Sequence, residues 1–159
     1  MTRSLYIINY IYNTWQPNNK ALKNIKGSRN MKNITVKEMI KSAKENLVEL
    51  SPQQVEAHLT IQDVNIIDLR DTSELIENGI IPGSYHASRG HLEFFADPNC
   101  EYYKDFFNKE KNIILYCHSG ARSALAAKTL QLMGYDKISH MKGGFKLWMK
   151  EVGIIIDYK

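Results

Sequence analysis

Residues 112–130 read NIILYCHSGARSALAAKTL, and this stretch joins a strand-like sequence to a helix-like one. Its first six residues are nearly all apolar, which is typical of a strand covered on both faces. From Ala121 onward the sequence favours a helix to Met133, with Gly134 as its stop signal. We expect the buried stripe of this helix to contain Leu125, Ala126, Thr129, Leu132 and Met133. A strand followed closely by a helix is the repeating unit of α/β folds.

The rest of the chain alternates in the same way. We expect further strands at 64–69, 84–88 and 137–141. We expect further helices at 36–47, 51–59, 71–79 and 145–151, and helical pieces within the aromatic-rich segment 91–108. This alternation predicts an α/β fold with a parallel sheet and helices on both faces. Active sites of such sheets lie at the carboxyl ends of strands, which is where Cys117 falls.

The loop after Cys117 concentrates features that favour a thiolate over a thiol. Backbone N–H groups of a tight loop with Gly120 can point inward as an anion nest, and the following helix N-terminus adds positive potential. Arg122 adds a full charge, while Ser119 and Ser123 can donate hydrogen bonds. On this basis, loss of Arg122 would slow the chemistry on the order of 10²–10³-fold. The alternative interpretation is a buried, inert structural cysteine.

Three motifs follow one another along the chain: DLRDTSELIENGIIPGS from Asp68, CHSGARS from Cys117 and GGFKLWM from Gly143. Their D-x-R, I-P-G, C-x-x-x-x-R and G-G-x-x-x-W patterns resemble the rhodanese family over about residues 45–153. The resemblance implies a five-stranded parallel sheet with helices on both faces, and a persulfide on Cys117. The implied catalytic residues are Cys117 and Arg122. The implied sulfur-binding loop consists of His118, Ser119, Gly120, Ala121 and Ser123, and the implied supporting residues are Asp68 and Arg70.

One position departs from the family pattern. Many members have G-H-I-P-G, whereas this chain has Ile80 in place of the histidine. Any polar contact made by that histidine is therefore missing, but the chemistry of the loop is untouched. We expect Asp68, Arg70 and Glu74 to brace loops at the strand ends.

The length of the loop separates two related chemistries. Four residues lie between Cys117 and Arg122, whereas the related dual-specificity phosphatases enclose five in a wider cradle. The smaller ring suits a single sulfur atom, and a leaving sulfite needs no general acid. We therefore expect double displacement through Cys117, with thiosulfate or a persulfide as donor and a thiol or protein as acceptor. A non-catalytic binding module and, less favoured, a phosphatase or arsenate reductase remain as alternatives.

The net charge of +4 is unevenly spread. Residues 1–37 hold seven basic and no acidic residues, so the remainder carries −3. We expect residues 1–33 to be a basic, disordered leader or a misassigned start, with Met31 a sensible first residue, and 34–155 to form one domain. An organelle presequence is the second interpretation of this arm, and nucleic-acid binding is the third.

Composition bounds location, cofactors and partners. Cys100 and Cys117 are too few for a disulfide framework, which favours a reducing, cytoplasmic setting. No stretch reaches the ~18 consecutive apolar residues of a membrane helix, so no membrane partner is expected. The histidine spacing favours no metal site, and neither a cofactor nor a nucleic-acid partner is expected.

Other residues have a functional and a structural interpretation. Arg89 either binds an anionic donor or pairs with an acid. Cys100 is more simply an incidental thiol than a resolving one, and His118 contributes more through its backbone N–H than through its ring. Phe145 and Trp148 are expected in the core.

Overall fold

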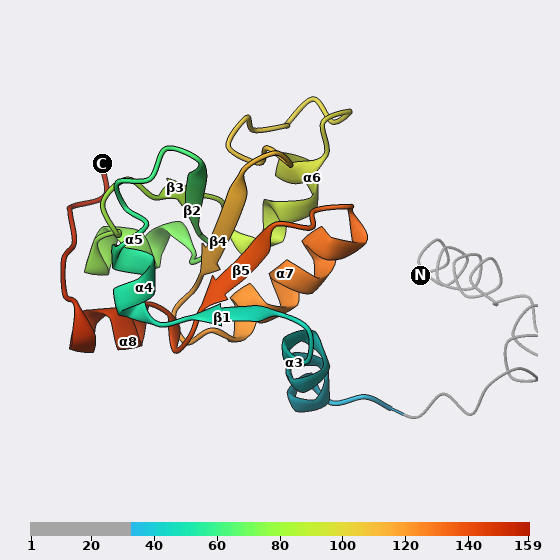
Figure 1. Ribbon diagram of the computed structural model, residues 1–159, viewed down its shortest axis with the longest axis horizontal. Helices are drawn as coiled ribbons and strands as arrows, with labels where there is room; N and C mark the ends of the chain where they lie inside the picture. Colours follow the sequence, from blue (N-terminus) through green and yellow to red (C-terminus); the bar gives the residue numbers. More distant parts are fainter. Residues whose placement is uncertain (1–32) are drawn as a thin grey trace, which may run out of the picture. The chain divides into compact units, whose positions relative to one another are not determined.

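The computed structural model describes residues 33–159, so the expected leader at 1–33 lies almost entirely outside them. Five strands form one sheet in the order β1-β5-β4-β2-β3, and every pair in it is parallel. The strands are β1 (Val48–Leu50), β2 (Val64–Asp68), β3 (Tyr85–His86), β4 (Asn112–Tyr116) and β5 (Ile138–Met141). The expected five-stranded parallel sheet is confirmed (Figure 1).

Helices cover both faces of this sheet, as expected. The helices are α3 (Val36–Lys44), α4 (Pro52–Glu56), α5 (Thr72–Asn78), the 3-10 turn η1 (Arg89–His91), α6 (Leu92–Ala96), α7 (Ala121–Leu132) and α8 (Gly144–Glu151). One core cluster joins the sheet to α3, α6 and α7, and a second joins it to α4 and α8. In Figure 1 the ends of β4 and β5 point toward α8, so the carboxyl edge of the sheet lies between α7 and α8.

The start of the domain differs from expectation. The helix expected at 36–47 ends at Lys44, and Val48–Leu50 forms an edge strand that the sequence analysis missed. This strand is three residues long and largely exposed, so it carries too little periodicity to be distinguished from a continuing helix. The capping boxes at Thr35 and Ser51 start α3 and α4, the second as expected.

The expected buried stripe of α7 is right in part, since Ala126 is buried and Leu125, Thr129 and Met133 are partly buried. Leu132, placed in the stripe, is 80% exposed. The residues that α7 buries are small, with one exception: Ser123, Ala124, Ala126, Ala127 and Leu130. Small side chains let the helix backbone approach the sheet closely, and this close approach outweighs the hydrophobicity of Leu132. It also brings the first turn of α7 against Cys117.

The segment after β3 contains short helical pieces, as expected. Only η1 and α6 are helical within residues 89–108, and turns follow up to β4. The fully buried Phe107 and Tyr135 pack edge to face there. Their contact closes the end of the domain opposite the carboxyl edge of the sheet.

The C-terminal tail packs back onto the domain. Ile156 forms an antiparallel bridge with Ile80, the residue that replaces the family's histidine. The Trp148 indole donates to Ile154 O at 2.8 Å, and the Tyr158 hydroxyl lies 3.0 Å from His86 Nδ1. Ile80 is 5% exposed, so an apolar contact fills the place of the histidine. Phe145 and Trp148 lie in the core, as expected.

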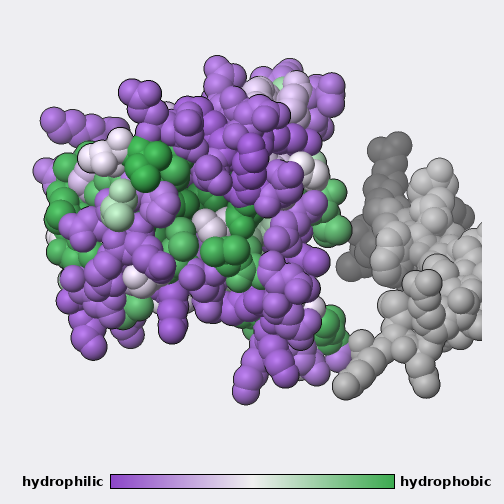
Figure 2. All heavy atoms as spheres, viewed as in Figure 1, coloured by the Kyte–Doolittle hydropathy of each residue, from purple (hydrophilic) through white to green (hydrophobic). Residues whose placement is uncertain are grey.

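The surface of the described residues is mostly hydrophilic. Figure 2 shows hydrophobic residues that extend from the left edge to the middle of the viewed face, with polar side chains above and below them. No helix within residues 33–159 is long and apolar enough to cross a membrane.

Candidate active site

Cys117 lies directly after β4, at the carboxyl edge of the sheet, and is 1% exposed. The Gly120 N–H donates a hydrogen bond to Cys117 Sγ at 3.2 Å, and the Cys117 thiol faces Ser123 Oγ at 3.7 Å. Gly120 has a φ of 92°, a left-handed conformation that favours glycine, and caps α7. The chain therefore turns tightly around the sulfur and enters α7 with its backbone donors close to it.

The N-terminus of α8 donates hydrogen bonds to the backbone of this loop. The Phe145 N–H donates to Cys117 O at 2.8 Å, and the Lys146 N–H donates to His118 O at 2.9 Å. Gly144, with a φ of 61°, approaches so closely that a Cβ there would overlap the Cys117 carbonyl and lie 2.8 Å from the His118 carbonyl carbon. The G-G-x-x-x-W motif thus fixes the backbone that carries Cys117.

Arg122 is held by acidic side chains of α5 and its cap. It donates from both terminal nitrogens to Glu74, at 2.6 and 2.8 Å, and lies 3.5 Å from Asp71. Hydrogen bonding from Arg122 lowers the pKa of Glu74 to about 2, and hydrogen bonding to Glu74 raises the pKa of Arg122. The full free charge expected at Arg122 is therefore shared with Glu74. Sequence reasoning could not foresee this because the pair joins α5 to α7.

Asp68 and Arg70 form a buried ion pair at the end of β2, the strand that pairs with β4. Arg70 contacts both Asp68 oxygens, at 2.7 Å in the closest case, and donates to Gly79 O at 2.7 Å. Its guanidinium lies 3.7 Å from the centre of the Phe145 ring. These contacts tie the end of β2 to the end of α5 and to α8, which is the arrangement of a brace.

The remaining predicted residues fall into two groups. The loop residues His118 and Ser119 are exposed and Ala121 is partly buried; the His118 ring lies 4.0 Å from Glu74. Arg89 and Cys100 are not brought to the sulfur. Arg89 pairs with Glu93 at 3.0 Å and with Thr129, while Cys100 lies in a turn after α6.

Two residues near the sulfur were not singled out from the sequence. His140 is fully buried and lies 3.2 Å from Ser123 Oγ, and Glu49 lies 3.1 Å from the other ring nitrogen of His140. The missed strand β1 carries Glu49, and the parity of β5 alone points His140 toward α7. Within residues 33–159 no group of three or more His, Cys, Asp or Glu side chains could hold a metal ion.

The fold and site define an α/β domain that presents one cysteine at the carboxyl edge of a parallel sheet, in a loop closed by a helix N-terminus. Residues 51–151 match the rhodanese-like domain family. The chain belongs to this family, and the resemblance drawn from the three motifs is confirmed.

Relatives with known names include sulfur-transfer proteins. The chain is 28% identical to mouse thiosulfate sulfurtransferase/rhodanese-like domain-containing protein 3 over 102 residues, 61% of this chain and 65% of that protein. It therefore spans slightly less than two thirds of that relative.

Two solved structures share the fold. The polysulfide-sulfur transferase homodimer from Wolinella succinogenes has a TM-score of 0.62 and 32% identity, covering 77% of this chain and 88% of that one. A protein of unknown function from Rhodopseudomonas palustris, described as a possible tyrosine phosphatase, has a TM-score of 0.75 and 37% identity. The match covers 81% of this chain and 99% of that one.

Proposed function

We propose that this protein is a sulfurtransferase and that Cys117 carries the transferred sulfur as a persulfide. The main supporting observation is the environment of the Cys117 sulfur. Its Sγ accepts a hydrogen bond from the Gly120 N–H at 3.2 Å, in a loop whose backbone is hydrogen-bonded to α8. A backbone donor aimed at sulfur stabilises negative charge on it. Family membership and the sulfur-transfer names of two relatives agree with this chemistry.

In the first half of the reaction the Cys117 thiolate attacks the sulfane sulfur of thiosulfate or of a persulfide donor. A new S–S bond forms at Sγ, and the donor's own bond to that sulfur breaks. Sulfite, or the donor thiolate, leaves with the electron pair of the broken bond. Because sulfite is a stable anion, no side chain has to protonate it.

In the second half an acceptor nucleophile attacks the outer sulfur, and Cys117 leaves as a thiolate. An S–S bond is about 2.05 Å long, so the outer sulfur extends beyond a cysteine that is 1% exposed. Cyanide and a small thiol are the simplest acceptors for an assay. The natural acceptor is a thiol or a protein thiol.

The test is the intact mass of the protein after treatment with thiosulfate or a persulfide. The protein should gain one sulfur atom and lose it on addition of cyanide. Cys117→Ser should gain nothing and should not turn over, because a serine hydroxyl stays protonated near neutral pH. Cys100→Ser is the matched control and should behave like the parent chain. Sulfur on Cys100, or a gain in Cys117→Ser, would overturn the proposal.

A phosphatase is the second candidate, because the Rhodopseudomonas palustris protein is described as a possible tyrosine phosphatase. The four-residue spacer between Cys117 and Arg122 makes a narrower ring than a phosphatase loop, which favours sulfur over a phosphoryl group. An aryl phosphate and a sulfur donor assayed on one preparation separate the candidates. Cys117-dependent phosphate release without sulfur transfer would support the phosphatase, and a binding module would show neither.

A further inference from the structure

Behind the active loop, four side chains form a continuous polar path through an otherwise apolar layer. The Cys117 thiol faces Ser123 Oγ at 3.7 Å, and Ser123 Oγ lies 3.2 Å from His140 Nδ1. His140 Nε2 lies 3.1 Å from a carboxylate oxygen of Glu49. Ser123 and His140 are both fully buried, whereas the Glu49 side chain is 32% exposed. The path therefore leads from the sulfur to the surface on the side of β1.

Strand register brings these side chains onto one face of the sheet. Glu49 on β1 is the register partner of His140 on β5, and His140 is the partner of Leu115 on β4. Cys117 follows Leu115 by two residues and so projects toward the same face. The first turn of α7 places Ser123 above them. The alignment of the four groups thus follows from the fold.

The hydrogen bonds along this path can be donated in one direction, from the Cys117 thiol to Ser123 and from Ser123 to His140. The Ser123 hydroxyl holds one hydrogen, which can be donated to Gly120 O at 3.1 Å or to His140 Nδ1 at 3.2 Å. Its oxygen accepts from the Cys117 thiol. When the hydroxyl donates to His140, both hydrogens point away from the sulfur and toward the imidazole.

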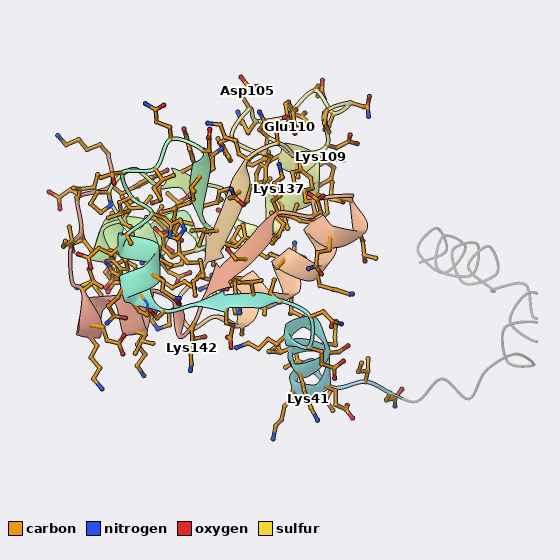
Figure 3. The ribbon with its side chains drawn as sticks, viewed as in Figure 1. Lys41, Asp105, Lys109, Glu110, Lys137 and Lys142 are labelled. Atoms are coloured by element: carbon orange, nitrogen blue, oxygen red, sulfur yellow. The ribbon has the colours of Figure 1, made fainter. Side chains whose placement is uncertain are left out.

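The charges around His140 suit a neutral base that can accept a proton. Burial lowers the pKa of His140, and Lys44 on α3 lowers it further, while Glu49 raises it. Lys44 lies 2.6 Å from Glu49 and lowers the pKa of that carboxyl, which therefore stays ionised. Lys142, at the turn after β5 in Figure 3, acts on Glu49 in the same sense.

Nε2 of His140 is buried and has no hydrogen-bond partner within residues 33–159. The Glu49 oxygen lies 3.1 Å from this nitrogen, which is the distance of an ion pair. An unpartnered ring nitrogen beside a carboxylate costs stability while the ring is neutral. It gains an ionic partner when the ring carries a proton.

We propose that Ser123 and His140 form a proton relay that takes up the thiol proton of Cys117 and so prepares the nucleophile. The proposal rests on the proposed function, since it concerns how that thiolate forms. The Sγ–H proton passes to Ser123 Oγ as the Ser123 hydroxyl proton passes to His140 Nδ1. Sulfur keeps the electron pair, and thiolate and imidazolium form together with Glu49 as the counter-charge. Arg122, which is paired with Glu74, takes no part in this proton transfer.

Glu49→Gln tests the proposal at a partly exposed position, and Lys44→Met is its matched control. Both variants break the Lys44–Glu49 ion pair, but only Glu49→Gln removes the counter-charge of His140. The rate of sulfur loading, followed by intact mass, is measured from pH 5 to pH 10 with a persulfide donor. Glu49→Gln should move the rise of the rate to higher pH by about one unit, which is roughly a tenfold loss below it. The plateau at high pH and the KM for the donor should stay unchanged, and Lys44→Met should show no upward shift.

His140→Asn and Ser123→Ala should shift the profile in the same direction, with His58→Asn as the control for loss of a histidine. Thermal unfolding identifies any variant that fails to fold. If His140→Asn or Ser123→Ala does not fold, the pH profile of Glu49→Gln decides the test by itself. Nitrogen NMR provides an independent signature: His140 should be doubly protonated in the parent chain at neutral pH and singly protonated in Cys117→Ser. A Glu49→Gln profile identical to that of Lys44→Met, or a neutral His140 in both samples, would overturn the relay. Loading by the parent chain would in that case still support the sulfurtransferase, whereas absence of loading would overturn the proposed function itself.

Discussion

Arg122 donates both of its terminal nitrogens to Glu74, at 2.6 and 2.8 Å, across the gap between α7 and α5. Hydrogen bonding to Glu74 is the largest influence that raises the pKa of Arg122, and the charge of Cys117 adds a smaller one of the same sign. The arginine at the end of the loop is therefore a shared group. Its charge interacts chiefly with Glu74 and more weakly with Cys117.

This sharing changes the expected effect of removing Arg122. A charge that is paired and about one third exposed contributes less than a free, buried donor. We expect Arg122→Ala to slow sulfur loading by roughly tenfold, below the 10²–10³ expected from a dedicated donor. Arg122→Lys should recover only part of the rate, because an ammonium cannot form the two-nitrogen contact with Glu74. Stopped-flow loading measures both, and a loss of a thousandfold would show that Arg122 acts directly on sulfur.

The acidic side chains beside Arg122 should select against dianionic donors. Asp71 lies 3.5 Å from Arg122 and its side chain is 70% exposed. Asp71→Asn removes one negative charge but keeps a residue that caps helices well. We expect its KM for thiosulfate to fall by about two- to threefold at low salt, with kcat unchanged, and the gain to vanish at high salt. A KM that stays constant at all salt concentrations would mean that Asp71 does not face the donor.

The ion pair should also stabilise the fold in a defined pH window. Hydrogen bonding from Arg122 holds the pKa of Glu74 at about 2, against a usual 4.5. A lowered carboxyl pKa gives stability that is fully present above the unfolded value and is lost as the pH falls through the folded one. Glu74→Gln, which preserves the capping box, should lower Tm by roughly 1–4 °C at pH 7. The difference from the parent should shrink between pH 4.5 and 2.

Glu77→Gln is the control for that measurement, because Glu77 is an exposed residue of the same helix. Its Tm should follow that of the parent chain throughout. A Tm difference between Glu74→Gln and the parent that persists unchanged to pH 2 would show that the charge of Glu74 is not its source.

The close approach of Gly144 predicts a large steric effect. Gly144 and Gly83 both have positive φ, 61° and 73°, but only Gly144 has backbone atoms where a Cβ would lie. Gly83→Ala should cost about 1–2 kcal/mol of unfolding free energy, the penalty of the left-handed conformation alone. Gly144→Ala should cost more than about 3 kcal/mol and should disturb sulfur loading. Urea unfolding compares the two, and equal losses would contradict a clash with the active loop.

The strand, loop and helix around Cys117 could be predicted from local sequence. A short apolar run ending in Cys117, then Gly120, then a helix, is a pattern whose geometry is decided within ten residues. The fold class followed from the alternation of strands and helices. The turn at Gly143 was assigned only by resemblance, and the structure supplies its physical reason.

The parts that sequence did not reveal depend on contacts between distant segments. Glu49 meets His140 through the pairing of β1 with β5, two strands separated by most of the domain. Strand β1 was itself hidden because three exposed residues show no clear period. The partner of Arg122 depends on where α5 packs, and the buried face of α7 depends on how closely small residues let it approach the sheet.

The hydrogen bonds from α8 to the loop determine which residues must be moved together if this site is grafted onto another protein. The carbonyls of Cys117 and His118 accept hydrogen bonds from the N–H groups of Phe145 and Lys146, which lie in α8, after the last strand of the sheet. Residues 117–122 grafted alone onto another parallel sheet would keep the nucleophile but lose the platform under it. A working graft must therefore carry the glycine turn at 143–144 with it, so the transferable unit is discontinuous.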